Sequence, residues 1–222
     1  MSAPRLVPVR LPSDPKGVVL VLHGGASRRG SPMVSPTQLS VLRMVPIARG
    51  VARAGRGRLA VFRLLNSARG WDTGHTPVQD ARWALDQVRE RYGSRPVCLV
   101  GHSLGGRAAL LAGGEPGVHS VVALNPWVYA SDDADLSGRQ VLVVHGAADR
   151  IAPPSRSAQV ARRLGRRTRV GYISVPGGKH AMLAHHAQFD RYAAQFATAT
   201  LLGDEAPGPV GQVLAGEDWV TA

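Results

Sequence analysis

The chain has 222 residues, 44% of them hydrophobic, a length that supports one compact domain with a core of ordinary size. The apolar run from Val18 to Leu22 is far shorter than the roughly 20 residues that a membrane-spanning helix needs, and the first residues lack the pattern of a secretory signal. We therefore expect a cytoplasmic protein without a transmembrane anchor. The single cysteine, Cys98, excludes an internal disulfide and a cysteine-based zinc site.

The formal net charge of +12 raises the question of a polyanionic partner, such as nucleic acid or anionic lipid. Of the 27 basic residues, 25 are Arg and two are Lys, and they are spread along the whole chain rather than gathered in one basic arm. The densest group, within residues 162–169, falls at the end of a predicted helix, where positive charge is favourable next to the helix dipole. The sequence therefore disfavours nucleic-acid binding, and it leaves the oligomeric state open.

Apolar runs alternate with helix-like segments from residue 17 to about residue 200, which indicates an α/β fold with a mostly parallel sheet covered by helices on both faces. The predicted parallel strands are apolar throughout their centres, as strands buried on both faces should be. They span residues 17–22, 59–65, 96–100, 118–124, 140–144 and 168–175, and a short antiparallel strand near residues 6–11 precedes them. Apolar positions three and four apart predict helices over residues 39–54, 77–92, 104–112, 154–164 and 181–201.

The C-terminal segment, residues 203–222, differs in composition from the rest of the chain. It contains four acidic residues and no Lys or Arg, so residues 1–202, with all 27 basic and 11 of the 15 acidic residues, carry a formal charge of +16. We expect a loose tail rather than a segment that folds back onto the basic body. The chain then divides into a domain of residues 1–202 and an acidic, Gly- and Pro-containing tail of residues 203–222.

Residues 101–105, Gly-His-Ser-Leu-Gly, match the Gly-x-Ser-x-Gly pattern. The pattern follows a predicted strand and opens a predicted helix, which is the strand-turn-helix context of a nucleophile elbow. In such a turn the serine has strained backbone geometry and an exposed hydroxyl, and the flanking positions must be Gly because a Cβ atom would collide with a neighbouring strand or helix. Ser103 is therefore the candidate nucleophile.

A serine hydroxyl needs a general base within hydrogen-bond reach, and the base needs an acid that orients it. Asp149 follows the predicted strand at residues 140–144, and His180 follows the predicted strand at residues 168–175. Because the strands are parallel, both residues should reach the same edge of the sheet as Ser103. The sequence therefore predicts His180 as the base and Asp149 as the orienting acid.

The segment His23-Gly24-Gly25-Ala26 directly follows the predicted strand at residues 17–22 and is a candidate oxyanion loop. Acyl transfer develops negative charge on the carbonyl oxygen, and backbone N–H groups that are fixed beforehand stabilise this charge. Leu104, the residue after Ser103, supplies one such N–H group. The second comes from Gly25 or Ala26, and the sequence does not choose between them.

These segments, in this order and at matching strand ends, resemble the α/β-hydrolase superfamily over roughly residues 5–200, in particular its small esterases of the dienelactone-hydrolase or carboxylesterase type. The resemblance implies Ser103 as nucleophile, His180 as base and later acid, and Asp149 as the orienting carboxylate. Some members carry the acid after the preceding strand, where this chain has Asp132, Asp133 and Asp135, so these three stay open as alternatives. Residues 125–139 are too few for the folded lid that larger members insert there.

Trp71 and Trp127 fall in loops at the same predicted edge, where they either line a substrate pocket or pack as ordinary loop residues. No metal site is expected, because the remaining histidines have no Cys or carboxylate at ligand spacing. The sequence thus predicts a lidless serine hydrolase that cleaves small soluble carboxylic esters or thioesters through an acyl-enzyme, without a cofactor. Acyl transfer, carbon–carbon hydrolysis or perhydrolysis on the same fold stays open as an alternative, as does a non-catalytic polyanion-binding protein.

Overall fold

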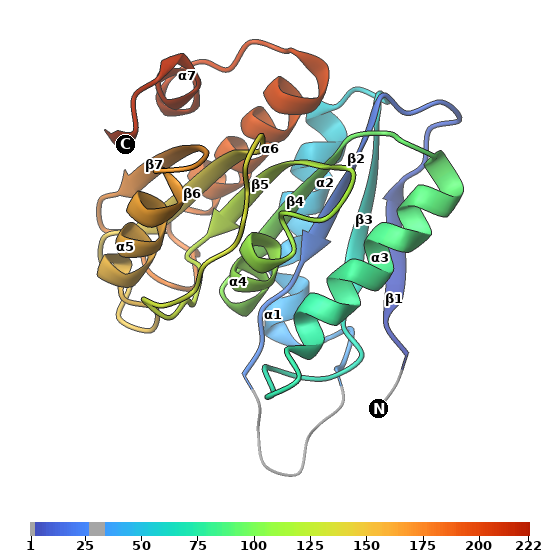
Figure 1. Ribbon diagram of the computed structural model, residues 1–222, viewed down its shortest axis with the longest axis horizontal. Coiled ribbons are helices and arrows are strands. Elements are labelled where there is room, and N and C mark those ends of the chain that lie inside the picture. Colours follow the sequence, from blue (N-terminus) through green and yellow to red (C-terminus); the bar gives the residue numbers. More distant parts are fainter. Residues whose placement is uncertain (1–2, 27–33) are drawn as a thin grey trace.

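The computed structural model describes residues 3–26 and 34–222 and contains one eight-stranded sheet with the order β1-β3-β2-β4-β5-β6-β7-β8 (Figure 1). Only β1 runs antiparallel to its neighbour, and every other pair of adjacent strands is parallel. The strands are β1 (Arg5–Arg10), β2 (Gly17–Leu22), β3 (Leu59–Leu65), β4 (Val97–His102), β5 (Val118–Leu124), β6 (Gln140–Gly146), β7 (Arg169–Val175) and β8 (Trp219–Thr221). The predicted α/β class with a mostly parallel sheet is confirmed.

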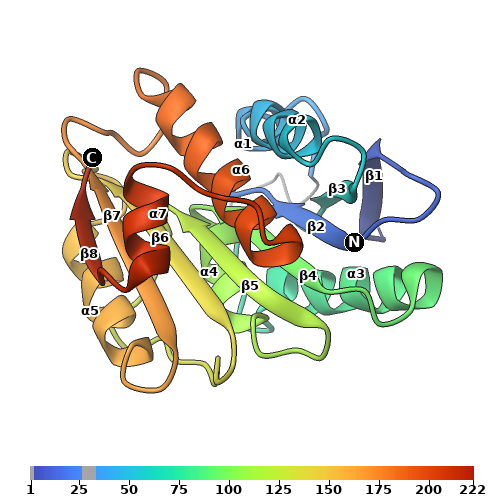
Figure 2. The same cartoon turned by 90° about the horizontal axis from the view of Figure 1, so that it is seen from above.

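Helices cover both faces of the sheet (Figure 2). One face is covered by α2 (Met44–Ala54), α6 (His186–Leu202) and α7 (Pro209–Ala215), and the other by α3 (Thr76–Tyr92), α4 (Leu104–Leu111) and α5 (Pro154–Leu164). Successive residues of a strand point to opposite faces, so Leu20 packs in the cluster beneath α3 and α4, whereas Val19 and Val21 pack in the cluster beneath α2 and α6. Because each face of the sheet packs against its own apolar layer of helices, the strands have apolar residues on both faces.

Two of the predicted helices differ from the structure by more than a one-residue shift at an end. The predicted helix over residues 39–54 is divided at Arg43 into α1 (Leu39–Leu42) and α2. Pro46 lacks the N–H group that would bond the carbonyl of Leu42, so one continuous helix cannot form across this point. The helix predicted from residue 181 begins only at His186, because the residues before it form the turn that carries His180.

The C-terminal segment differs from the loose tail that the sequence led us to expect. β8 pairs in parallel with β7 and extends the edge of the sheet, and α7 buries Val210 and Val213 in the core. Arg58 donates two hydrogen bonds to the carboxylate of Asp204, at 2.9 and 2.7 Å. Residues 203–222 are thus part of the same folded body, and a few well-spaced valines provide the anchoring that the Gly and Pro content obscured.

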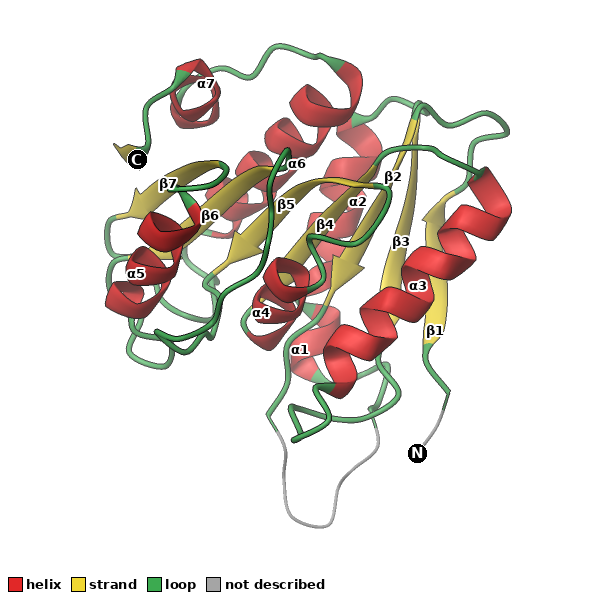
Figure 3. Ribbon diagram, viewed as in Figure 1, coloured by secondary structure: helices red, strands yellow, loops and turns green. Residues whose placement is uncertain are grey.

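The segment between β5 and β6, residues 125–139, contains turns but neither a helix nor a strand (Figure 3). This edge of the sheet accordingly has no folded lid at that insertion point, as predicted. Within the described ranges, no helix combines the length and apolar character that crossing a bilayer requires.

Candidate active site

Ser103 lies in the tight turn between β4 and α4, with φ of 56° and ψ of −120°. A positive φ is strained for a residue with a Cβ atom, and this turn is held by close packing on either side. A Cβ atom at Gly101 would lie 2.1 Å from the carbonyl oxygen of Gly105, and one at Gly105 would lie 2.4 Å from the carbonyl oxygen of Leu22. Neither position can take a larger residue without moving backbone, so the two glycines let β4 turn directly into α4 with the serine at its tip.

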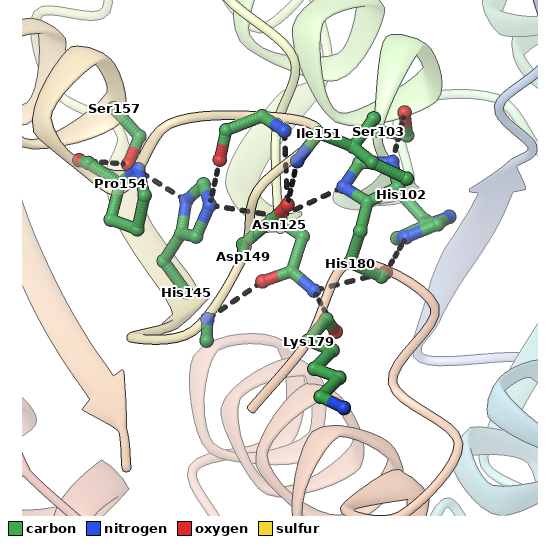
Figure 4. A network of polar contacts seen from close by, with 12 residues as sticks. His102, Ser103, Asn125, His145, Asp149, Ile151, Pro154, Ser157, Lys179 and His180 are labelled. Carbon is green, nitrogen blue, oxygen red and sulfur yellow. Dashed lines mark hydrogen bonds and ion pairs between the residues drawn. The ribbon is translucent and has the colours of Figure 1, made fainter. Parts of the chain in front are cut away.

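The structure brings His180 and Asp149 to Ser103 from separate loops (Figure 4). The Nε2 atom of His180 lies 2.9 Å from the Oγ atom of Ser103, and the Nδ1 atom lies 2.8 Å from Oδ2 of Asp149. An ionised carboxylate only accepts hydrogen bonds, so Nδ1 carries the proton in the neutral ring. Nε2 is then the free acceptor and faces the serine hydroxyl, which is the arrangement that a general base needs.

Asp149 is buried and accepts hydrogen bonds through both carboxylate oxygens. Its Oδ1 atom accepts the backbone N–H groups of Ile151 and Ala152, at 2.8 and 2.9 Å. Burial raises the pKa of Asp149, but hydrogen bonds from His145, His180 and the Ala152 N–H outweigh burial, and the net pKa lies below its ordinary value. The side chain therefore stays a carboxylate near neutral pH.

A second histidine, His145, contacts the same carboxylate from the opposite side (Figure 4). Its Nε2 atom lies 3.2 Å from Oδ2 of Asp149 and 2.9 Å from the carbonyl oxygen of Ala152. Since the carbonyl can only accept, Nε2 must be protonated. The Nδ1 atom meets the hydroxyl of Ser157 at 2.8 Å, and that hydroxyl lies 3.1 Å from the hydroxyl of Tyr172. A buried polar chain thus extends from Asp149 into the core.

His102 and Asn125 hold the backbone of the loop that carries His180. The Nε2 atom of His102 donates to the carbonyl oxygen of His180 at 2.9 Å, and the Asn125 amide donates to the carbonyls of Lys179 and His180 at 3.1 Å each. The Asn125 carbonyl oxygen accepts the N–H of Gly146 at 2.8 Å, which ties this loop to the end of β6. Burial, together with the neighbouring His180, lowers the pKa of His102 to about 3, so its ring is neutral and structural.

The predicted oxyanion loop lies against Ser103. A Cβ atom at Gly24 would be 3.0 Å from the Cβ atom of Ser103, and Gly25 has φ of 150°, a region that favours glycine. His23 fixes the loop, because its Nδ1 donates to the Gly24 carbonyl at 2.6 Å and its Nε2 accepts the Asn66 N–H at 3.2 Å. Leu104 opens α4, where N–H groups have no helical partner, and it lines the same cavity as Gly25 and Ala26.

The alternative acids are engaged elsewhere. Asp132 accepts two hydrogen bonds from Arg107, at 2.7 Å each, Asp133 pairs with Arg167, and Asp135 accepts the hydroxyl of Ser137. Among the described residues, Asp149 is the only carboxylate for which a hydrogen bond to His180 is found. The same residues contain no cluster of three or more His, Cys, Asp or Glu side chains that could bind a metal ion.

A cavity of about 580 Å³ opens beside Ser103. Trp71 and Trp127 both lie on the wall of this cavity, which corresponds to the pocket-lining alternative of the two that the sequence left open. The wall also includes Arg107, whose guanidinium lies 4.1 Å from the ring centroid of Trp71 and 4.6 Å from that of Tyr129. Sequence reasoning missed Arg107, although its position four residues after Ser103, one turn along α4, was an available signal.

No family model matches the sequence, and no curated protein matches it. Solved structures do resemble the chain. A serine hydrolase without a lid from Xanthomonas campestris has a TM-score of 0.68 at 19% identity, over 93% of this chain and 98% of the other. Est1E from Butyrivibrio proteoclasticus, with bound ferulic acid, has a TM-score of 0.67 at 14% identity, over 89% and 95%. The esterase domain of a Rhodothermus marinus protein has a TM-score of 0.61 at 18% identity, over 89% and 98%.

At these identities the likeness concerns the fold. The chain has the α/β-hydrolase fold in a form without a lid, which is the fold that the resemblance in the sequence implied.

Proposed function

We propose that the protein is a serine hydrolase that cleaves small soluble carboxylic esters or thioesters through an acyl-enzyme. The observation that carries this proposal is the continuous hydrogen-bond path from the Ser103 hydroxyl through both ring nitrogens of His180 to Asp149, with distances of 2.9 and 2.8 Å. Such a path activates an otherwise weak nucleophile by giving its proton a place to go.

In the first half of the reaction, Oγ of Ser103 attacks the substrate carbonyl carbon while Nε2 of His180 accepts the hydroxyl proton. The resulting imidazolium is stabilised by the carboxylate of Asp149. The negative charge on the carbonyl oxygen is accepted by the N–H of Leu104 and by the N–H of Gly25 or Ala26, which line the cavity beside the serine. His180 then gives its proton to the departing alcohol or thiol.

In the second half, water loses a proton to His180 and attacks the acyl carbon; the bond from that carbon to Oγ of Ser103 then breaks, His180 returns the proton to Oγ, and the acid leaves. The segment between β5 and β6 contains no helix or strand, so no folded lid covers the site from that insertion point. An open cavity of about 580 Å³ with a mainly apolar wall suits a small ester better than a substrate that must be enclosed.

The proposal is tested with a fluorophosphonate probe and short p-nitrophenyl esters. We expect the probe to label the wild type and not Ser103→Ala, and we expect that variant to lose ester hydrolysis. A fluorophosphonate reacts only with an activated serine, so equal labelling of both proteins would refute the assignment of Ser103.

A further inference from the structure

The charged side chains found on the wall of the cavity are positive. Two arginines, Arg43 and Arg107, line it, and none of the described residues that line it is Asp or Glu. Arg107 is neutralised by its two hydrogen bonds to Asp132. Asp149 lies behind His180 with a fully buried side chain, so it does not face the cavity. Arg43 therefore supplies a positive charge that none of the described residues on this wall offsets.

Arg43 occupies the junction between α1 and α2 and is half-buried. Among the described residues, no hydrogen bond, ion pair or aromatic ring contact involves its guanidinium group. Burial without a partner lowers the pKa of Arg43, and its charge contributes to the lowered pKa of His102, which places it near the candidate catalytic residues. A half-buried guanidinium without a partner costs free energy, which an anion in the cavity would recover.

Most of the remaining wall is apolar and continues onto the surface. Leu39, Tyr129 and Ile151 line the cavity and are 78%, 47% and 65% exposed. Leu42, one turn after Leu39 on α1, and Leu183, two residues after the lining residue Ala181, are exposed as well. Three large exposed apolar side chains, Leu39, Tyr129 and Ile151, thus lie on the wall of the cavity, as such side chains do at sites that bind an apolar group.

We propose that the substrate is an amphiphilic ester or thioester, with an apolar chain that packs on Leu39, Tyr129 and Ile151 and an anionic group, carboxylate or phosphate, that pairs with Arg43. This rests on the proposed function, because the cavity also contains Ser103. The anion lies away from the bond that is cleaved, so its role is to bind and orient the ester rather than to react.

The test compares esters that differ only in terminal charge. Methyl octanoate and monomethyl suberate form a pair on the acyl side, and hexyl acetate and 6-acetoxyhexanoate form a pair on the alcohol side. A phosphonate of the length of the preferred carboxylate distinguishes the two kinds of anion. The wild type should hydrolyse the anionic member of one pair with a kcat/KM about tenfold higher than that of the neutral member, and added salt should reduce this preference.

Arg43→Gln should abolish this preference, Arg43→Lys should retain part of it, and Arg49→Gln serves as the matched control. Arg49 is an exposed arginine on α2 that does not line the cavity, so its loss should leave the ratio as in the wild type. No preference in the wild type for either pair, or an equal loss for both members of a pair in Arg43→Gln, would overturn the proposal.

A binding measurement separates this proposal from the function on which it rests. Titration calorimetry of wild type and Arg43→Gln with octanoate and with octanamide reports on the anion site without any turnover. If the wild type binds octanoate more tightly than octanamide and Arg43→Gln does not, the anion site is supported. This holds even if no ester is cleaved, in which case the proposed function fails and the anion site stands. Equal binding of octanoate by both proteins contradicts the site.

Discussion

His145 donates a hydrogen bond to Oδ2 of Asp149, the same carboxylate oxygen that accepts the hydrogen bond from His180. The His145 Nε2 atom lies 3.2 Å from Oδ2 of Asp149, and both side chains are fully buried. Asp149 is thus held between two imidazole rings, one facing Ser103 and one facing the core. A second N–H on the carboxylate both stabilises its charge and restricts its rotation, and so orients His180.

Replacing His145 should therefore affect catalysis from outside the cavity. We expect His145→Ala to lower kcat about tenfold, the equivalent of about 1.4 kcal/mol, with little change in KM. His145→Gln, which keeps a donor, should recover part of the loss. Equal kcat in the alanine and glutamine variants would show that His145 serves packing alone.

The two glycines beside Ser103 should tolerate no side chain, in contrast to a glycine in open space. Gly105→Ala places a Cβ atom 2.4 Å from the carbonyl oxygen of Leu22, so we expect a loss of about 3 kcal/mol or more in the free energy of unfolding, together with loss of activity. Gly50→Ala, in α2 with nothing within 4 Å of the new atom, should instead stabilise the protein by about 0.5 to 1 kcal/mol. Urea unfolding of both variants provides the comparison, and similar midpoints would contradict the close packing of this turn.

The neutral ring of His102 should make stability depend on pH. Its pKa is about 3 in the folded protein and about 6.5 in an unfolded chain, so the unfolded state binds more protons between these values. The contribution of neutral His102 to the free energy of unfolding is complete above pH 6.5. It is lost as the pH falls toward 3, by up to about 1.4 kcal/mol per pH unit. In His102→Gln the free energy of unfolding should fall less steeply between pH 6 and 4 than in the wild type. Parallel curves for the two proteins would exclude a buried neutral His102.

Deleting residues 204–222 should lower the melting temperature. The deletion removes β8 from the edge of the sheet and takes away Val210, Val213 and Val220, which are almost fully buried. Burial of a valine is worth about 1.5 to 3 kcal/mol, so the loss should amount to several kcal/mol. Val213→Ala, with an expected loss of about 2 kcal/mol, separates packing from the effect of chain length. An unchanged melting temperature in the deleted protein would mean that the segment does not dock in solution.

The parts of the site that sequence analysis predicted are those whose chemistry leaves a local pattern. Ser103 lies between glycines that the turn requires, and Asp149 and His180 follow apolar strands whose parallel direction brings them to one edge. Asn125 and His145 leave no such pattern, because their partners are backbone groups and side chains that meet only through the tertiary fold.

The same difference between local pattern and tertiary contact explains why two segments of secondary structure were predicted wrongly. The segment before α6 contains helix-forming residues, but Met182 has φ of 58° and is buried, and the carbonyl of His180 is bonded to His102 and Asn125. Tertiary contacts therefore prevail over helix propensity in the loop that carries His180. The acidic charge and the Gly and Pro content of the C-terminal segment predict a tail, whereas a few buried valines are enough to dock the segment.

The central claim is that Ser103 is acylated during turnover. A p-nitrophenyl ester mixed with the protein and quenched in acid within the first turnovers should give an acyl group on the peptide that contains Ser103, detectable by mass spectrometry. His180→Ala should form this adduct far more slowly, and Ser103→Ala should form none. An adduct confined to another residue, or hydrolysis by Ser103→Ala at the wild-type rate, would contradict the mechanism.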